Sequence, residues 1–180
     1  MGKYHIGMYG GKFLPFHLGH RYCIEFAAKE CDILYVILFY GGKDEEEILK
    51  NHPESWLAAG SRKIMLEKLV NGINKEALLK CGNNEGTVPK IIPKYIDISQ
   101  LRLPDGSEDW DAETPLVREI CGDRIDAVYS SEESYGEYFL RAYPEALHRL
   151  IDVPRIHYPI SGTDIRGFES EEERTRWMIK

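Results

Sequence analysis

The segment YHIGMYGGKFLPFHLGHRYCIEFAAKECDILYVILF, residues 4–39, decides the fold. Apolar residues alternate over 4–8 before two adjacent glycines, which predicts a short strand that runs into a glycine-rich turn. Apolar residues then recur at helical spacing over 19–30. Residues 33–39 are an uninterrupted apolar run, which is typical of a parallel strand buried on both faces. The segment therefore predicts one strand, helix, strand crossover unit.

The rest of the chain continues this alternation of strands and helices. The acidic stretch 41–47 predicts a solvated loop or a helix start. Further along, the patterns predict a helix over 61–70, a strand over 91–98 that Pro93 places at a sheet edge or a strand start, a helix over 114–120, a strand over 125–130, a helix over 135–143 and a final strand within 150–157. We therefore expect an α/β fold, a doubly wound, Rossmann-like parallel sheet with helices on both faces, as a single domain over residues 1–180. Ligands of such sheets bind at the carboxyl ends of the strands, where the winding direction reverses.

Composition limits the classes of function. With 180 residues, of which 43% are hydrophobic, the chain can bury a real core. Its net charge of −7 argues against a general nucleic-acid-binding surface, so any site for a polyanion must be local. The four cysteines are scattered, without a Cys-x-x-Cys pair, which indicates free thiols. No signal peptide or membrane-spanning run is present, and we expect a cytoplasmic protein.

The motif GGKFLPFHLGH, residues 10–20, lies where the first predicted strand ends and the first helix begins. Its glycines allow the backbone to turn beside a ligand, and the amides that open a helix favour an anion. Its two histidines, three residues apart, can place two imidazole donors on one side of that ligand. The candidate catalytic residues here are His17 and His20, and the candidate phosphate-binding residues are Gly10, Gly11, Lys12, Phe13 and Gly19. Taken alone, such histidines and glycines are also common in sites without function.

The motif PISGTDIR, residues 159–166, follows the last predicted strand. Ser161 or Thr163 can cap a helix there, which is ordinary local structure, with Arg166 left in solvent. In the functional interpretation, both hydroxyls and the helix-start amides bind phosphate oxygens, and Arg166 forks onto a terminal phosphate. A second phosphate-suited loop after the last strand favours this interpretation, because doubly wound topology brings such loops together.

Together the two motifs resemble the nucleotidyltransferase superfamily, whose pattern is His-x-Gly-His with a downstream Ile-Ser-x-Thr-x-x-Arg. The longer form Gly-Lys-Phe-x-Pro-x-His-x-Gly-His, with VYSSE at 128–132, is similar to NadR-type nicotinamide mononucleotide adenylyltransferases. The resemblance covers essentially the whole chain. NadR-type proteins often continue into a ribosylnicotinamide kinase domain, but this sequence contains no Gly-x-x-x-x-Gly-Lys-Ser/Thr loop.

The resemblance implies a reaction in which a phosphate oxygen of nicotinamide mononucleotide attacks the α-phosphorus of ATP, so that pyrophosphate leaves and NAD forms. Positioning and charge neutralisation would carry such a transfer. His17 and His20 would hold the α- and β-phosphates, and Ser161, Thr163 and Arg166 the β- and γ-phosphates. Mg²⁺ would be held mainly by the ATP phosphates, with no metal site made of protein residues.

Residues between the two motifs are candidates for binding the acceptor and ATP. Trp110 lies in a polar loop, and by the resemblance it could stack on the nicotinamide ring; equally, it could anchor its own loop to the core. Ser130 and Ser131 follow a predicted strand, where their hydroxyls either face ATP or cap a helix. Arg62 matches loosely a family position near the mononucleotide phosphate.

Three functions stay open at this point. The first is a nicotinamide mononucleotide adenylyltransferase, with ATP and nicotinamide mononucleotide as its binding partners. The second is an adenylyltransferase of the same superfamily with another acceptor, such as nicotinic acid mononucleotide, phosphopantetheine or FMN. The third is a non-catalytic sensor of adenine nucleotides. We expect no nucleic-acid or membrane partner, and the sequence leaves formation of a homo-oligomer open.

Overall fold

Five parallel strands form one sheet, in the order β3-β2-β1-β4-β5, in the computed structural model, which describes residues 2–81, 90–122 and 124–179. The strands are β1 (Tyr4–Gly11), β2 (Cys31–Tyr40), β3 (Lys90–Asp97), β4 (Ala127–Ser130) and β5 (Leu147–Leu150). Each neighbouring pair in this order is parallel. The predicted α/β fold with a doubly wound parallel sheet is confirmed.

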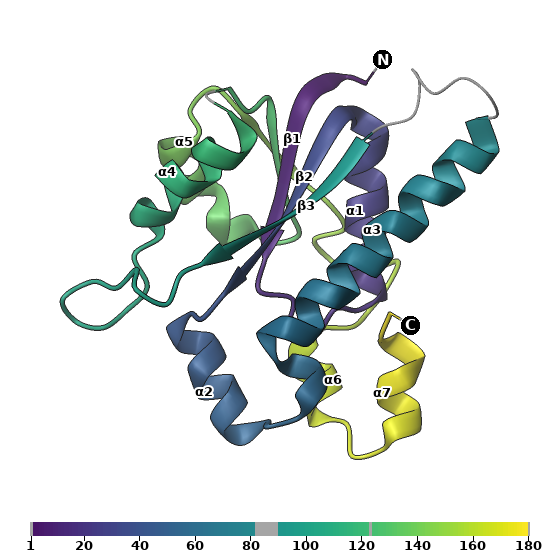
Figure 1. Ribbon diagram of the computed structural model, residues 1–180, viewed down its shortest axis with the longest axis vertical. Coiled ribbons are helices and arrows are strands. Elements are labelled where there is room, and N and C mark those ends of the chain that lie inside the picture. Colours follow the sequence, from purple (N-terminus) through teal and green to yellow (C-terminus); the bar gives the residue numbers. More distant parts are fainter. Residues whose placement is uncertain (1, 82–89, 123, 180) are drawn as a thin grey trace.

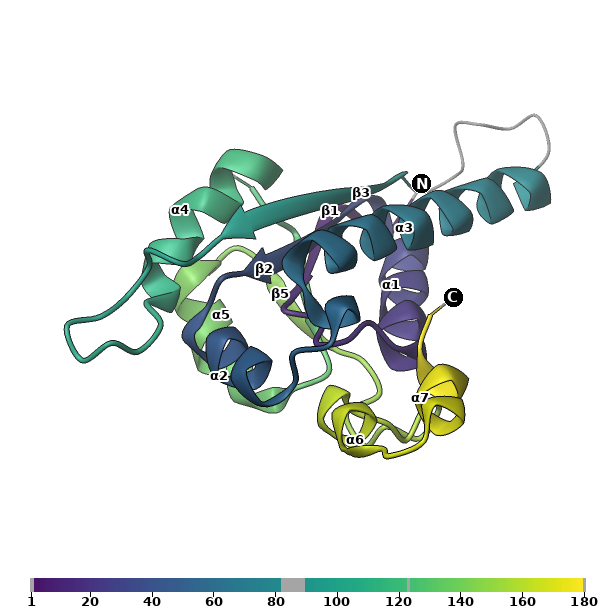
Figure 2. The ribbon, with the colours of Figure 1, turned by 60° about the horizontal axis from the view of Figure 1, so that its bottom comes forward.

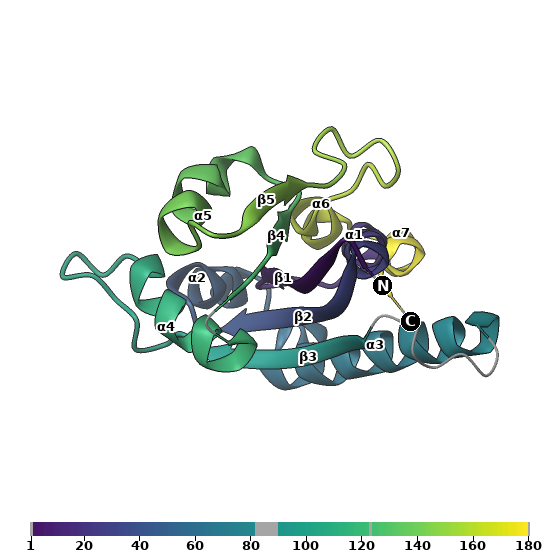
Figure 3. The same ribbon diagram turned by 90° about the horizontal axis from the view of Figure 1, so that it is seen from above.

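Helices cover both faces of the sheet. On one side lie α1 (Leu18–Glu30) and α3 (Ala59–Cys81), and on the other lie α4 (Trp110–Cys121) and α5 (Gly136–Ala142) (Figure 1). Seen from above, the strands follow one another from β3 to β5 between these layers (Figure 3). Beyond the carboxyl ends of the strands lie α2 (Lys43–Asn51) and α6 (Gly162–Gly167) (Figure 2). The remaining short elements are η1 (Ser55–Leu57), η3 (Glu133–Tyr135) and α7 (Glu171–Trp177).

The interior strand β2, between β3 and β1, explains why the sheet has a core on each face. Because side chains alternate along a strand, Leu34, Val36 and Leu38 pack in the cluster with α1 and α3. Ile37 points the other way, into the cluster with α4 and α5. All four side chains are fully buried. Each such side chain contributes about 1.5–3 kcal/mol of transfer free energy, and the uninterrupted apolar run is the sequence of a strand with two covered faces.

The winding direction reverses between β1 and β4. From β1 the chain extends to β2 and then β3 on one side, and it returns to place β4 and β5 on the other. Tyr9 is paired with Tyr129 across the β1–β4 boundary, so Gly10 and Ser130, the next residues, emerge beside each other. A doubly wound sheet binds its ligands at this switch point.

Two details of the predicted strands are wrong. Gly10 and Gly11 are the last residues of β1 instead of a turn, and the positive φ angle after the strand, 50°, belongs to Phe13. The final strand ends at Leu150, where the predicted strand begins. The residues that suggested a later strand form a loop, in which Asp152 and Arg155 have φ angles of 49° and 52°.

Other local predictions are confirmed or refined. Strand β3 lies at the sheet edge, as Pro93 requires, because proline has no amide for a second ladder of hydrogen bonds. The acidic stretch 41–47 is a helix start, since α2 begins at Lys43. Trp110 is the first residue of α4 instead of a loop residue. In the part of the chain that the structure describes, no helix has both the length and the apolar character needed to cross a membrane.

Candidate active site

Two cavities adjoin at the carboxyl end of the sheet, at the switch point between β1 and β4. The histidine cavity, about 200 Å³, has His17, His20 and Arg155 in its wall. The aromatic cavity, about 240 Å³, has Trp110 and Tyr138 in its wall. The residues that line both cavities are Gly10, Gly11, Lys12, Ser130 and Tyr135. Ligands in the two cavities would therefore meet over the end of β1.

His17 and His20 form the start of α1 and one wall of the histidine cavity. His17 is the N-cap of the helix, and its Nδ1 accepts a hydrogen bond from the Gly19 amide at 3.2 Å. Nδ1 of His20 accepts one from the His17 amide at 3.3 Å. Because an accepting Nδ1 carries no proton, the neutral rings hold their protons on Nε2. The helix start thus fixes the tautomer in which each Nε2–H is a donor.

Both imidazoles are neutral near pH 7. Burial, with a smaller contribution from the charge of Arg155, lowers the pKa of His17 to about 4. Burial is also the main cause that lowers the pKa of His20 well below its usual value, followed by His17 and Arg155. A neutral Nε2–H donates a hydrogen bond without adding charge to the empty site, and a bound anion would raise both pKa values.

Close packing explains the glycines of the first motif. A Cβ on Gly10 would lie 2.7 Å from the ring of Phe39, and a Cβ on Gly19 would lie 3.0 Å from the ring of His17. Their role is therefore close approach, and at Gly10 it is not the tight turn that the sequence suggested. The predicted phosphate-binding residues of this motif that line the histidine cavity are Gly10, Gly11, Lys12, Phe13 and Gly19.

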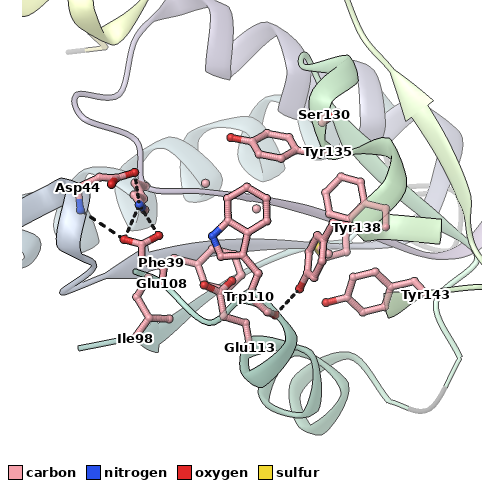
Figure 4. Close-up of a pocket in the computed structure, with 15 residues that line it drawn as sticks. Phe39, Asp44, Ile98, Glu108, Trp110, Glu113, Ser130, Tyr135, Tyr138 and Tyr143 are labelled. Atoms are coloured by element: carbon pink, nitrogen blue, oxygen red, sulfur yellow. Dashed lines mark hydrogen bonds and ion pairs between the residues drawn. The ribbon is translucent and has the colours of Figure 1, made fainter. Parts of the chain in front are cut away.

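Two carboxylates hold Lys12 between the cavities. Its Nζ lies 2.7 Å from Glu108 Oε2 and 3.1 Å from Asp44 Oδ2 (Figure 4). Its carbonyl accepts a hydrogen bond from the guanidinium of Arg62 at 2.5 Å. The charge of Lys12 is therefore anchored in this structure, and an incoming phosphate would compete with the carboxylates for it.

The second motif meets the first at Leu14. Arg166 donates hydrogen bonds to the Leu14 carbonyl and, at 3.1 Å, to Thr163 Oγ1. A Cβ on Gly162 would lie 2.5 Å from the Leu14 oxygen, so only glycine allows this approach. The two predicted loops therefore do come together. Of the second motif, Ile160 and Gly162 line the histidine cavity, whereas Ser161, Thr163 and Arg166 do not.

Ser161 performs the local role that the sequence allowed for it. It is the N-cap of α6, where its hydroxyl accepts from the Asp164 amide at 3.1 Å and donates to Asp164 Oδ2 at 2.6 Å. Phosphate binding by this hydroxyl stays a prediction, and it would have to compete with these bonds.

Ser130, the last residue of β4, and Ser131, the next residue, line the histidine cavity. The Ser130 hydroxyl donates to the Glu132 carbonyl at 3.0 Å and lies 2.7 Å from His148 Nε2. Neither serine caps η3 or α5. Their place in the wall suits the ATP-facing role, which stays a prediction.

Arg155 is a cavity residue that the sequence analysis missed. It lines the histidine cavity, and its guanidinium donates to Glu132 Oε1 at 2.8 Å and to the Ile160 carbonyl at 3.3 Å. The sequence predicts a strand within 150–157, and an arginine in a strand does not by itself indicate phosphate binding. An arginine on a loop six residues before Ser161 would have been a candidate for phosphate.

The aromatic cavity places Trp110 among tyrosines. Its indole lies 5.6 Å from the Tyr135 ring and 5.5 Å from the Tyr138 ring, centroid to centroid, and Tyr138 donates to its carbonyl at 2.9 Å (Figure 4). Trp110 is 40% exposed, so it is not simply an anchor in the core. The other wall residues were not predicted from the sequence, although Tyr135 and Tyr138, three residues apart, share one side of a predicted helix.

Arg62 lines neither cavity. It is fully buried, and it pairs with the buried carboxylate of Glu45 and donates to the Leu57 carbonyl at 2.7 Å. This position does not support the predicted contact of Arg62 with the mononucleotide phosphate. Its contact with the site is indirect, through the Lys12 carbonyl.

In the described residues, no three His, Cys, Asp or Glu side chains are grouped so that they could hold a metal ion. Two carboxylates, Glu132 and Asp152, do line the histidine cavity, and oxygen is the donor that Mg²⁺ prefers. Both already have partners, because Glu132 pairs with Arg155 and Asp152 accepts from the His157 amide at 3.1 Å.

Comparison with known proteins identifies the family. A family model described as cytidylyltransferase-like matches residues 8–168. The chain therefore belongs to the cytidylyltransferase-like family of the nucleotidyltransferase superfamily, and the superfamily expected from the two motifs is confirmed.

Curated relatives are distant and longer. The trifunctional NAD biosynthesis/regulator proteins NadR of Salmonella typhimurium (strain LT2) and Escherichia coli (strain K12) are each 25% identical to this chain over 162 residues, which is 89% of this chain and 36% of each relative. The chain thus spans about a third of the length of these relatives.

Solved structures share the fold. NadR in complex with NAD and AMP-PNP matches with a TM-score of 0.61 and 19% identity, over 96% of this chain and 44% of that one. A bifunctional NMN adenylyltransferase/ADP ribose pyrophosphatase from Francisella tularensis matches with a TM-score of 0.58 and 18% identity, over 97% of this chain and 45% of that one.

Proposed function

We propose that this member of the cytidylyltransferase-like family is an adenylyltransferase that joins ATP and nicotinamide mononucleotide to give NAD and pyrophosphate. The observation that carries the proposal is the pair of adjoining cavities, one with two imidazole donors and Arg155, the other walled by aromatic rings. The likeness to proteins named for NAD biosynthesis and NMN adenylylation supports it.

The chemistry is an in-line displacement at phosphorus. A phosphate oxygen of the mononucleotide forms a bond to the α-phosphorus of ATP, and the bond from that phosphorus to the bridging oxygen of the β-phosphate breaks. The electron pair leaves with pyrophosphate. Such a transfer needs no protein nucleophile, and positioning with charge stabilisation carries it.

The histidine cavity suits the triphosphate. The Nε2–H donors of His17 and His20 would bind phosphate oxygens and strengthen as negative charge builds on them. Arg155 would add a planar, charged donor. Thr163 and Arg166 are candidates for the terminal phosphates because Gly162 beside them lines the cavity. For Arg166 to bind there, its guanidinium would have to leave the Leu14 carbonyl.

We propose that Mg²⁺ is held mainly by the ATP phosphates, because the carboxylates of Glu132 and Asp152 already have protein partners. When bound, the ion would neutralise charge on the leaving pyrophosphate. The protein's own part is to hold the phosphates in line through the donors described above.

The aromatic cavity suits the flat ring of the acceptor. Trp110 and Tyr138 offer ring faces, and the pyridinium ring of nicotinamide mononucleotide is a cation that such faces attract. Lys12, at the boundary of the two cavities, would lie near the acceptor phosphate or the triphosphate, where it would exchange the carboxylate of Glu108 for phosphate.

The test is to incubate the protein with ATP, Mg²⁺ and nicotinamide mononucleotide and to measure NAD with a coupled dehydrogenase. We expect NAD in proportion to enzyme, and a loss of at least about a hundredfold in His20→Ala. His5→Ala is the matched control, because His5 lies at the opposite end of β1, paired with Asp32. Tight binding of ATP without any NAD would contradict the proposal and would indicate a nucleotide sensor.

A further inference from the structure

Glu113 is a buried carboxyl group in the wall of the aromatic cavity. Its residue is 9% exposed, and it lies one helical turn after Trp110 on the same side of α4. Within residues 2–81, 90–122 and 124–179, its carboxyl group forms no hydrogen bond or ion pair, and its oxygens are not among the fully enclosed polar atoms, so they reach the cavity space. Burying a carboxyl group without a partner is costly, so the cavity is poised to receive a partner from a ligand.

The surroundings of Glu113 are aromatic and acidic. Figure 4 shows the Trp110 indole between Glu113 and Tyr135. Burial first, and then the charge of Glu108, raise the pKa of Glu113 to about 7. The titratable and charged groups that line the cavity with it are Lys12, Asp44, Glu108, Tyr135, Tyr138 and Tyr143. Lys12 is the cation of this set, and it already forms ion pairs with Glu108 and Asp44.

We propose that Glu113 selects an acceptor whose ring carries a neutral carboxamide over one whose ring carries a carboxylate. This inference rests on the proposed function, because it concerns the acceptor of that reaction. A carboxamide NH₂ would donate to the Glu113 carboxyl and give it the partner that it lacks. The ring carboxylate of nicotinic acid mononucleotide has no N–H to donate, and its negative charge would add to the charges of Glu108 and of ionised Glu113.

The physical basis is the high cost of unpaired polar groups and like charges in a dry cavity. A site that forms a hydrogen bond with a substrate N–H strongly rejects an analogue that lacks this N–H. An apolar pocket rejects a substrate that differs by one methylene group far less strongly. Like charge in the wrong complex adds to the rejection. Trp110 contributes binding to both acceptors, since both carry the same flat cationic ring, so discrimination falls to Glu113.

The experiment measures kcat/KM for nicotinamide mononucleotide and for nicotinic acid mononucleotide with ATP and Mg²⁺. We expect the wild type to prefer the amide by more than about a hundredfold. In Glu113→Gln, the side-chain amide can accept from a carboxamide and donate to a carboxylate, so the preference should fall at least about tenfold through faster use of the nicotinate. Glu113→Met, which suits the apolar wall, should also lose the preference for the amide. Its side chain neither accepts a hydrogen bond from the carboxamide nor repels the ring carboxylate.

Asp111→Asn is the matched control. Asp111 lies on the same helix, its side chain is 65% exposed, and it pairs with Arg141 outside the cavity. This variant should keep the wild-type preference. An unchanged preference in both Glu113 variants, with normal melting temperatures, would overturn the inference while the adenylyltransferase stands.

Calorimetric titration of both mononucleotides into the same proteins separates this inference from the proposed function. Tighter binding of nicotinamide mononucleotide than of nicotinic acid mononucleotide, with this difference lost in Glu113→Gln, would support the role of Glu113 even if no NAD formed. The absence of NAD would then overturn only the proposed reaction. Failure of both mononucleotides to bind or react would overturn both proposals.

Discussion

His17 has two roles that a single substitution can separate. It caps α1 through Nδ1, and we propose that it binds phosphate through Nε2. Asparagine caps helices well but has no atom at the Nε2 position. His17→Asn should therefore keep the melting temperature while kcat falls about 10²–10³-fold. His17→Ala should lose both, with about 1 kcal/mol of stability lost with the cap. Near-normal activity of His17→Asn would show that the cap alone matters.

Arg155 should act on ATP binding. Arg155 and Lys12 are the Arg and Lys residues among those that line the histidine cavity. A hydrogen bond to a charged group contributes about 1.5–3 kcal/mol, so Arg155→Gln should raise the KM for ATP on the order of tenfold or more. Arg124→Gln is the control, since its side chain is 83% exposed and pairs with Asp126. The KM for ATP is measured by steady-state kinetics at varied ATP concentration. Equal KM values for the two variants would exclude a role of Arg155 in ATP binding.

Residues whose role depends on neighbours in sequence were predictable, and residues whose role depends on burial were not. His17, Gly19 and His20 form one local motif, and its geometry follows from a strand that leads into a helix. The role of Arg62 was not predictable, because the sequence does not distinguish a surface arginine from a fully buried one. Glu113 was missed for the same reason, since nothing in the sequence shows that its carboxyl group lies in an aromatic wall.

At the scale of elements, the pair Arg62–Glu45 joins α3 to α2 and, through the Lys12 carbonyl, to the loop after β1. Removing one partner leaves the other charge buried and alone, so Arg62→Met should lower the free energy of unfolding by about 3–5 kcal/mol. The double variant Arg62→Met, Glu45→Met should recover most of this loss, because buried pairs are often replaceable by apolar side chains. Urea unfolding measures both.

An exposed pair provides the comparison for that experiment. Arg141 and Asp111 lie 2.9 Å apart with side chains 62% and 65% exposed, and Arg141→Met should change stability by less than about 1 kcal/mol. If the double variant at Arg62 and Glu45 were no more stable than Arg62→Met alone, the buried charge of Glu45 would not be the cause of the loss.

Elements were predictable where burial leaves a pattern in the sequence. Strand β2, covered on both faces, is apolar throughout, and it was found. Strand β5 lies at the sheet edge with Leu147 and Leu150 51% and 42% exposed, so burial left no pattern there. The true strand was missed, and the apolar residues of the following loop were taken for it. Because this loop was predicted as a strand, Arg155 was not recognised as a candidate for binding phosphate.

At the scale of the whole molecule, alternation of strands and helices was sufficient to predict the doubly wound sheet and the end at which ligands bind. The division of that end into two cavities was not predictable. It depends on how Trp110, from the start of α4, packs against Tyr135 and Tyr138, near and within α5. These contacts join residues up to 28 positions apart and leave no periodic signal.

The buried carboxyl group of Glu113 should make the stability of the whole molecule depend on pH. Its pKa is raised from 4.5 to about 7 in the folded state, chiefly by burial. Below the lower value both states hold the proton, and its favourable contribution is fully present. Between the two values the unfolded chain releases the proton while the folded protein keeps it. The contribution is therefore lost as pH rises through the folded pKa.

Glu113→Gln removes this titration, so its stability relative to wild type should rise with pH. From about pH 5 to about pH 8, the difference in unfolding free energy between variant and wild type should shift on the order of 2 kcal/mol in favour of the variant. The fixed cost of a buried amide cancels in this comparison, as do all titrations common to both proteins. Denaturant unfolding at several pH values measures it, and Asp111→Asn, with its exposed side chain, should show little trend. A flat difference for Glu113→Gln would mean that the carboxyl group is hydrated in solution, and a hydrated carboxyl group would have no need of the acceptor's amide as a partner.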